Sequence, residues 1–328
     1  MMNEKTIVIL HQFVPDDAPQ DEKDVLSEVA YVASTLRNLG YEPVPVAVSF
    51  AIDRMIASLN EIKPAIVFNL VETLQGTGKL CYMPLMVLDY LKLKYSGGHT
   101  DAMYQTTNKI LAKTLLQYHH IPTPSWQSVD DAAANGLRLE FPVIVKPIWE
   151  DASVGITDDS ICRDHAAFNR RVSTIAKENL ALYVAEQFIA GREVNVALLA
   201  DAGGPQVLPP AEILFNDYPE GKPAIVNYNA KWEEDSFEYN HTPRTFAFNS
   251  SDTGMLNRAK EFARSCWDIF GLCGYARVDM RIDAANNPWV LEVNSNPCIS
   301  PECGFITAAN EAGLSIEQVV RRIVDDAR

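Results

Sequence analysis

The 328-residue chain is predicted to be an α/β protein with an open, mostly parallel sheet near its N-terminus. In roughly the first hundred residues, short apolar segments alternate with segments whose apolar residues recur every three or four positions. Such strand–helix alternation is typical of parallel sheets with right-handed crossovers. Near the C-terminus, two segments alternate apolar and polar residues with a period of two, which predicts an antiparallel hairpin. The length allows two or three packed subdomains.

The expected elements follow from the spacing of apolar residues. A helix over residues 23–39 is indicated by Val25, Val29, Val32 and Leu36 on one face, with Gly40 as its stop. Other helices are expected over residues 83–91, 107–119, 164–179 and 253–270, and at the C-terminus. Strands are expected over residues 6–10, 44–48, 65–70, 94–96, 141–146, 182–186 and 193–199. Residues 201–251 are expected to form strands joined by long loops, which often carry function in compact enzymes.

Composition limits the classes of function. The formal net charge of −15 argues against nucleic acid or an anionic membrane as a partner. No uncharged apolar run approaches ~20 residues, and the start of the chain resembles a strand more than a signal peptide. The six cysteines include no CxxC pair, so neither a structural zinc site nor a disulfide framework is expected. A reducing, cytoplasmic environment fits this pattern.

The expected hairpin, residues 274–283 and 289–297, is the most informative segment. Its alternation separates an apolar face (Val278, Met280, Ile282, Leu291 and Val293) from a polar face (Arg277, Asp279, Arg281, Glu292 and Asn294). If the apolar face is buried, Asp279, Glu292 and Asn294 converge, and such oxygen atoms suit Mg²⁺. The alternative is a hairpin with a solvated outer face, which is the commoner meaning of this alternation.

Four motifs follow one another along the chain. They are Val-Ile-Val-Lys-Pro (143–147), Ala-Ser-Val-Gly-Ile (152–156), Glu-Gln-Phe-Ile-Ala-Gly-Arg-Glu-Val (186–194), and the Arg-x-Asp and Leu-Glu-x-Asn of the hairpin. In type and order they resemble the ATP-grasp enzymes, and among these the D-alanine–D-alanine ligases. The resemblance covers roughly residues 65–320. It implies an ATP-grasp fold with an N-terminal α/β subdomain (1–105), a central subdomain (106–190) and a C-terminal subdomain with the metal site (191–328).

The resemblance also implies roles for the matching positions. ATP would be bound by Lys109, Lys146, Glu186, Gln187, Ile189, Glu193 and Lys231, and two Mg²⁺ or Mn²⁺ ions by Asp279, Glu292 and Asn294. Arg277 would stabilise the tetrahedral intermediate, and Ser153 belongs to the loop that closes over it. Without the resemblance, Glu186 and Glu193 would be interpreted as solvated strand ends. Lys109 would serve equally well as a surface lysine of a helix, and Lys231 as an ordinary loop lysine.

The sequence departs from the D-alanine–D-alanine ligases where amino acids would bind. Residues 11–22 contain no glycine where the family has a glycine-rich loop. Ala152 stands in place of a serine, and Trp232 in place of a tyrosine. Cys298 replaces a glycine, and Cys303-Gly304 replaces a Ser–Leu pair that grips the second substrate. The ATP and metal positions are spared, which indicates retained chemistry with altered substrates.

We therefore expect an ATP-dependent ligase that joins a carboxylate to an amine through an acyl phosphate, with small amino-acid or amine substrates. One alternative is an authentic D-alanine–D-alanine ligase of peptidoglycan synthesis. Another, from a different class, is a non-catalytic ATP-binding regulator. The tendency of the family to dimerise leaves a homodimer possible.

Overall fold

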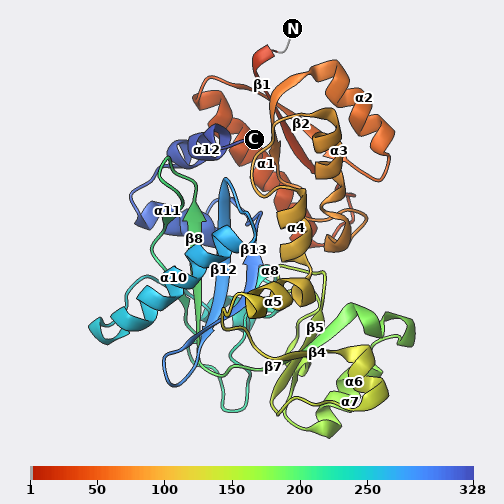
Figure 1. Ribbon diagram of the computed structural model, residues 1–328, viewed down its shortest axis with the longest axis vertical. Coiled ribbons are helices and arrows are strands. Elements are labelled where there is room, and N and C mark those ends of the chain that lie inside the picture. Colours follow the sequence, from red (N-terminus) through yellow and green to blue (C-terminus); the bar gives the residue numbers. More distant parts are fainter. Residues whose placement is uncertain (1–2) are drawn as a thin grey trace.

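The computed structural model describes residues 3–328, with side chains from residue 5 onward. Three sheets follow one another along the chain (Figure 1). The first has the order β2–β1–β3 and is parallel throughout, with β1 at Asn3–Gln12, β2 at Glu42–Val48 and β3 at Pro64–Asn69. The predicted parallel sheet is therefore confirmed.

The same N-terminal part of the chain contains helices α1 (Gln20–Asn38), α2 (Ile52–Ile62) and α3 (Met83–Leu91). The apolar face predicted for α1 packs into a core with β1 and with α12 (Ile316–Asp325). Gly40 has a φ of +87°, a value that favours glycine, and the helix stops just before it. The expected strand over residues 94–96 is reduced to a single bridge between Tyr95 and Val67. Helix α2 was not among the expected elements.

The expected helix over residues 107–119 is α5 (Lys109–Tyr118), and a helix that was not expected, α4 (Thr100–Thr107), directly precedes it. Asn108 separates them with a ψ of 101°, and its side chain accepts a hydrogen bond from the backbone N–H of Leu111. An asparagine in this position caps a helix and favours a new start. Lys109 therefore begins a helix instead of continuing one.

The second sheet is antiparallel in the order β4–β7–β5–β6. Its strands are β4 (Trp126–Ser128), β5 (Val143–Pro147), β6 (Ile161–Cys162) and β7 (Tyr183–Gln187), and its helices are α6 (Val129–Asn135) and α7 (His165–Ser173). The helix expected over residues 164–179 ends early. The Ser173 and Thr174 hydroxyls donate to the carbonyls of Arg170 and Arg171, and such local bonds compete with helix continuation.

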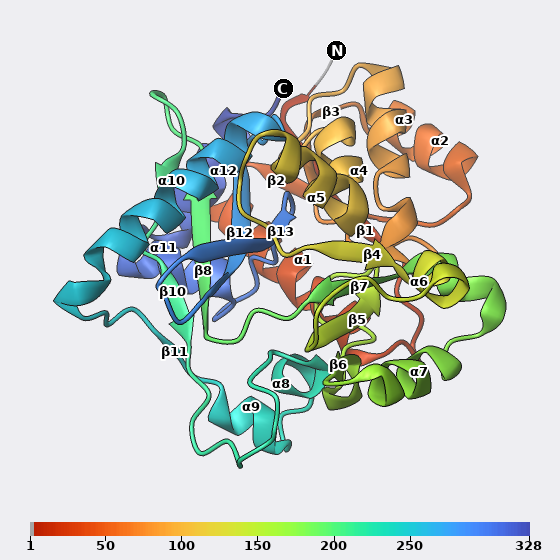
Figure 2. The same ribbon diagram turned by 60° about the horizontal axis from the view of Figure 1, so that its bottom comes forward.

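The third sheet has the order β11–β10–β8–β12–β13, with β9 paired to β8. The strands are β8 (Arg192–Leu199), β9 (Gln206–Val207), β10 (Ala211–Ile213), β11 (Arg244–Thr245), β12 (Tyr275–Ile282) and β13 (Pro288–Asn294), and α10 (Thr253–Ile269) and α11 (Gly304–Glu311) accompany them. Short 3-10 helices lie at Gly78–Leu80, Asp158–Ser160, Lys177–Leu182 and Ser250–Asp252. Residues 201–251 also contain two short helices that were not expected, α8 (Tyr228–Trp232) and α9 (Phe237–His241). Figure 2 shows α8 beside the second sheet, near β6.

A β-bulge interrupts the β12–β13 hairpin. Asp279 pairs with Glu292 but Met280 pairs with Val290, so Leu291 is an extra residue on β13. Val290 joins the core beside α10, whereas Leu291 lines a cavity together with Glu292. The prediction that Leu291 lies on the apolar core face is therefore wrong, because the bulge breaks the period of two.

The six cysteines are unpaired. Among residues 3–328, no helix is both long and apolar enough to cross a lipid bilayer. The three sheets occupy separate stretches of sequence, and the exact subdomain boundaries between them stay a prediction.

Candidate functional site

A cavity opens between the second and third sheets and collects most of the predicted site. Eleven of the twelve predicted residues line it: Lys109, Lys146, Ser153, Glu186, Gln187, Ile189, Glu193, Lys231, Arg277, Asp279 and Glu292. Asn294 lines an adjoining second cavity instead. Ile144, Phe188, Ile213 and Ile225 give the first cavity apolar walls, as in most small-molecule sites.

Glu186 forms a buried charge cluster in the wall of this cavity. Its Oε2 atom lies 3.0 Å from Lys146 Nζ and 3.1 Å from Lys113 Nζ. Glu186 is only 1% exposed, so it is not a solvated strand end. Its Oε1 atom is buried without a hydrogen-bond partner among the described residues. A buried acceptor without a partner is costly, which makes this oxygen a candidate ligand contact.

Lys113 was missed from the sequence. It is fully buried, and its Nζ also donates to Thr123 Oγ1 at 3.0 Å. Burial lowers the pKa of Lys113 to about 8, although Glu186 opposes this effect. The sequence offered one indication of Lys113. Residues four apart on a helix share a face, and Lys109, four residues earlier, was already a candidate.

Lys109 is 3% exposed, which excludes a surface lysine. Its Nζ donates to the Glu150 carbonyl and to Asp151 Oδ1, and it lies 3.7 Å from Glu292 Oε2. Burial alone would lower the pKa of Lys109, but Asp151 and Glu292 raise it above its ordinary value. Lys109 therefore keeps its charge beside the carboxylates of the hairpin.

The polar face of the hairpin lines the same cavity. Arg277 donates from Nε and Nη2 to both oxygens of Asp279, at 2.8 Å each, and Asn195 Nδ2 donates to Asp279 Oδ1 at 2.8 Å. A carboxylate offers about four lone-pair sites, so Asp279 retains capacity for one more contact. Asn195 was not predicted as a site residue, because it lies on β8 and meets Asp279 of β12 only when the two strands pair.

Glu292 stays ionised in this environment. Burial would raise its pKa, but Lys109 and neighbouring cations lower it to about 2. Among residues 3–328 no group of three His, Cys, Asp or Glu side chains could hold a metal ion. The available donors are two carboxylates and the Asn294 amide. In kind they fit Mg²⁺, which takes its other ligands from phosphate oxygens and water.

Arg281 fixes the segment that follows β7. Its guanidinium donates to the Ile189 carbonyl at 3.0 Å and to the Gly191 carbonyl at 2.9 Å, and it pairs with Glu193 at 3.2 Å. The Gln187 N–H donates to the Ser125 carbonyl, so that N–H is not free for a ligand. Arg281 shares the polar face of β12, and the period of two was the signal for it.

Two segments meet over the first cavity, namely residues 151–158 and 222–242, called here the lid. Ser153 Oγ donates to the Val226 carbonyl at 2.7 Å, and Trp232 Nε1 donates to the Ala152 carbonyl at 3.0 Å. The Tyr228 N–H donates to the Ile156 carbonyl at 3.2 Å. Ser153 therefore holds the two segments together in this structure.

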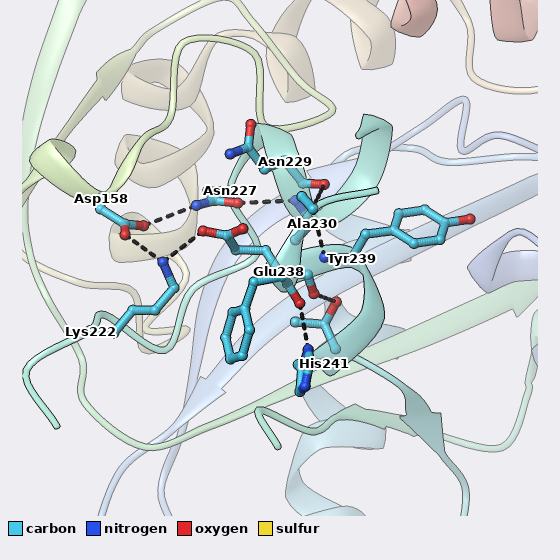
Figure 3. Close-up of polar contacts among 11 residues, drawn as sticks. Asp158, Lys222, Asn227, Asn229, Ala230, Glu238, Tyr239 and His241 are labelled. Atoms are coloured by element: carbon cyan, nitrogen blue, oxygen red, sulfur yellow. Dashed lines mark hydrogen bonds and ion pairs between the residues drawn. The ribbon is translucent and has the colours of Figure 1, made fainter. Parts of the chain in front are cut away.

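The lid is also held by charge (Figure 3). Lys222 Nζ lies 2.7 Å from Asp158 Oδ2 and 2.6 Å from Glu238 Oε1, and Figure 3 shows it between the two carboxylates. Asn227 donates to the other oxygen of Asp158 at 3.0 Å and accepts from the Ala230 N–H. These contacts position the short helix that carries Lys231 above the cavity.

The second cavity, about 740 Å³, is larger than the first, about 190 Å³. Glu150, Lys231, Arg244 and Arg277 line both, so the cavities adjoin at these residues. Many of the positions at which the sequence departs from the family pattern line the second cavity: Gln12, Pro19 to Glu22, Ala152, Trp232, Cys298, Cys303 and Gly304.

The first helix and the lid meet at this cavity. Tyr228 donates from its hydroxyl to Asp21 Oδ1 at 2.8 Å. Asp24 accepts from the Cys298 thiol at 3.3 Å and from the Ser300 hydroxyl at 3.2 Å. Burial, with Asp24 and Asp151 nearby, raises the pKa of Glu72 to about 8. The wall formed by the N-terminal elements is therefore acidic.

Comparison with known proteins agrees with this architecture. A family model described as D-ala D-ala ligase C-terminus matches residues 114–325. The D-alanine–D-alanine ligase of Gloeobacter violaceus is 30% identical over 316 residues, covering 94% of this chain and 96% of the relative. That of Bordetella avium is 29% identical over 243 residues, covering 73% and 72%. The crystal structure of the Bacillus anthracis ligase complexed with ATP superposes with a TM-score of 0.74 at 21% identity, covering 99% and 97%, and confirms the predicted fold.

Proposed function

The chain belongs to the D-alanine–D-alanine ligase family of ATP-dependent C–N ligases, and from this premise we propose that it joins a carboxylate substrate to an amine substrate, at least one of which is not D-alanine. One observation carries the proposal. The residues predicted to bind ATP line the first cavity, whereas none of the positions that depart from the family pattern does, and many of them line the second. We therefore assign catalysis to the first cavity and the choice of amino-acid substrate to the second.

In the first step, a carboxylate oxygen of one substrate attacks the γ-phosphorus of ATP, and the bond to the ADP oxygen breaks. The product is an acyl phosphate. Lys109, Lys146 and Lys231 would offset the negative charge on the phosphate oxygens during transfer. Asp279, Glu292 and Asn294 would hold Mg²⁺, which supplies further charge neutralisation when it is bound.

In the second step, the amine nitrogen attacks the acyl carbon, the C–O bond breaks, phosphate leaves and the nitrogen loses a proton. Arg277 would stabilise the oxyanion, because its bidentate contact with Asp279 fixes the guanidinium at the junction of the cavities. The lid would exclude water, which otherwise hydrolyses the acyl phosphate.

The test is amino-acid-dependent release of ADP and phosphate from Mg²⁺-ATP, across D- and L-amino acids and small amines, with products identified by mass. An amide from a pair other than two D-alanines supports the proposal. D-alanyl-D-alanine as the sole product would identify an authentic D-alanine–D-alanine ligase. Binding of ATP without any turnover would instead indicate a regulator.

A further inference from the structure

Arg244 is a cation without an anion. It begins β11 and lines both cavities beside Arg277. Its Nε atom is buried without a hydrogen-bond partner among the described residues, and within residues 5–328 its guanidinium makes one hydrogen bond, from Nη1 to Thr307 Oγ1 at 3.3 Å. No carboxylate of residues 5–328 lies within ion-pair distance of its guanidinium. The two ion pairs on the neighbouring strand join Arg277 to Asp279 and Arg281 to Glu193.

The guanidinium lies over Gly304. A Cβ atom on Gly304 would lie 3.1 Å from Arg244 Nη2 and 3.5 Å from its Cζ. A branched side chain at residue 304 would therefore need the same space as the guanidinium. Cys303-Gly304 stands where the family pattern has the Ser–Leu pair, so Arg244 and Gly304 are a matched combination at this position.

A largely buried guanidinium without a counter-ion is costly, and its planar fork matches the two oxygens of a carboxylate. We propose that Arg244 binds the carboxylate of the amine substrate, the one that remains in the product, in place of the Ser–Leu pair. The amine substrate is then a free amino acid and not a simple amine. This inference rests on the proposed function, because it assigns a substrate to the second cavity.

The test compares the wild type with Arg244→Gln, Arg244→Lys and the surface control Arg138→Gln, whose side chain pairs with Asp131 at the protein surface. Acceptors are D- and L-alanine, glutamate and lysine, each as the free acid and as the primary amide. We expect Arg244→Gln to raise the KM of the accepted free acid roughly ten- to a hundredfold, as for the loss of a hydrogen bond to a charged group. The KM of ATP should change less than about twofold, and Arg244→Lys should be intermediate because it keeps the charge but not the fork.

Comparing each free acid with its amide distinguishes a contact with the carboxylate from a general structural effect of the substitution. If Arg244 contacts the carboxylate, the wild type prefers the acid over its amide, and Arg244→Gln loses that preference without harming use of the amide. An equal rise of KM for acid and amide, or no change for either, would overturn the proposal. Gly304→Leu gives a second test that leaves Arg244 in the chain, and it should weaken the same preference by displacing the guanidinium.

Failure of the proposed function gives a different result. If the wild type makes no product with any acceptor, calorimetry with Mg²⁺ and a non-hydrolysable ATP analogue measures binding of the same free acids. Binding that Arg244→Gln abolishes keeps Arg244 as a carboxylate site in a protein that is not a ligase. The absence of binding to the wild type sinks both proposals.

Discussion

Replacing Glu292 with glutamine tests the charge arrangement at the hairpin. In the wild type this side chain is 21% exposed and lies 3.7 Å from Lys109 Nζ. Its pKa of about 2 is below its ordinary value of 4.5. At about 1.4 kcal/mol for each pH unit, the difference corresponds to about 3 kcal/mol of net stabilisation, which is what the attraction of the surrounding cations leaves after the cost of burial. Glu292→Gln should lower the free energy of unfolding by about that amount at pH 7.

The dependence on pH follows from the direction of the change. A carboxyl group whose pKa is lower in the folded state stabilises fully above its unfolded value, near 4.5, and loses that contribution as the pH falls toward about 2. The gap in stability between wild type and Glu292→Gln should therefore shrink as the pH is lowered from about 5 to about 3. Urea unfolding followed by circular dichroism measures this gap. The control is Glu261→Gln at an exposed position, whose free energy of unfolding should stay within about 0.5 kcal/mol of the wild type.

Turnover supplies the second readout of the same variant. Loss of one of two hairpin carboxylates should reduce ADP release at least about a hundredfold, while ATP affinity measured by calorimetry changes little. A Glu292→Gln variant that is as stable as the wild type at pH 7 and turns over normally would refute the reasoning.

Other perturbations address separate features. Gly191→Ala should destabilise the protein by about 3 kcal/mol in urea unfolding, because the new Cβ would lie 1.9 Å from the Ile282 carbonyl at a φ of +141°; Gly254→Ala, with nothing within 4 Å, is the control. Tyr228→Phe removes the hydrogen bond to Asp21, worth about 1 kcal/mol, and should speed proteolytic cleavage of the lid. Unchanged cleavage would show that this contact does not hold the lid. EDTA should abolish ADP release, and either Mg²⁺ or Mn²⁺ should restore it; turnover that resists EDTA contradicts the proposed ion site.

The hairpin shows how far the sequence predicts the site. Period-two alternation placed Arg277 and Asp279 on one face, because a strand in a regular ladder allows little else. The same rule failed at Leu291, since a bulge leaves no trace in the spacing of apolar residues. Register between two strands is settled by packing against α10, which the spacing alone does not report.

Buried cationic side chains were the other part of the site that the sequence did not predict. Lys113 and Arg244 look like ordinary polar positions in sequence, one on an amphipathic helix and one in a loop-rich segment. What distinguishes them is what surrounds them. Lys113 lies against Glu186 from another element, and Arg244 lies over a glycine sixty residues further along the chain. Such long-range juxtapositions arise only when the sheets assemble.

The bulge makes two properties of the site separately adjustable. Glu292 faces Asp279 through the register of the hairpin, and removal of Leu291 would leave that pairing intact while restoring an unbroken ladder. What would be lost is an apolar side chain from the wall of the first cavity. The number of residues in β13 thus sets the shape of that wall, whereas the partner strand sets the position of the carboxylates. A ligase built this way can change the apolar contact that the first cavity offers a nucleotide by adding or deleting a single residue, without moving the carboxylates of the hairpin.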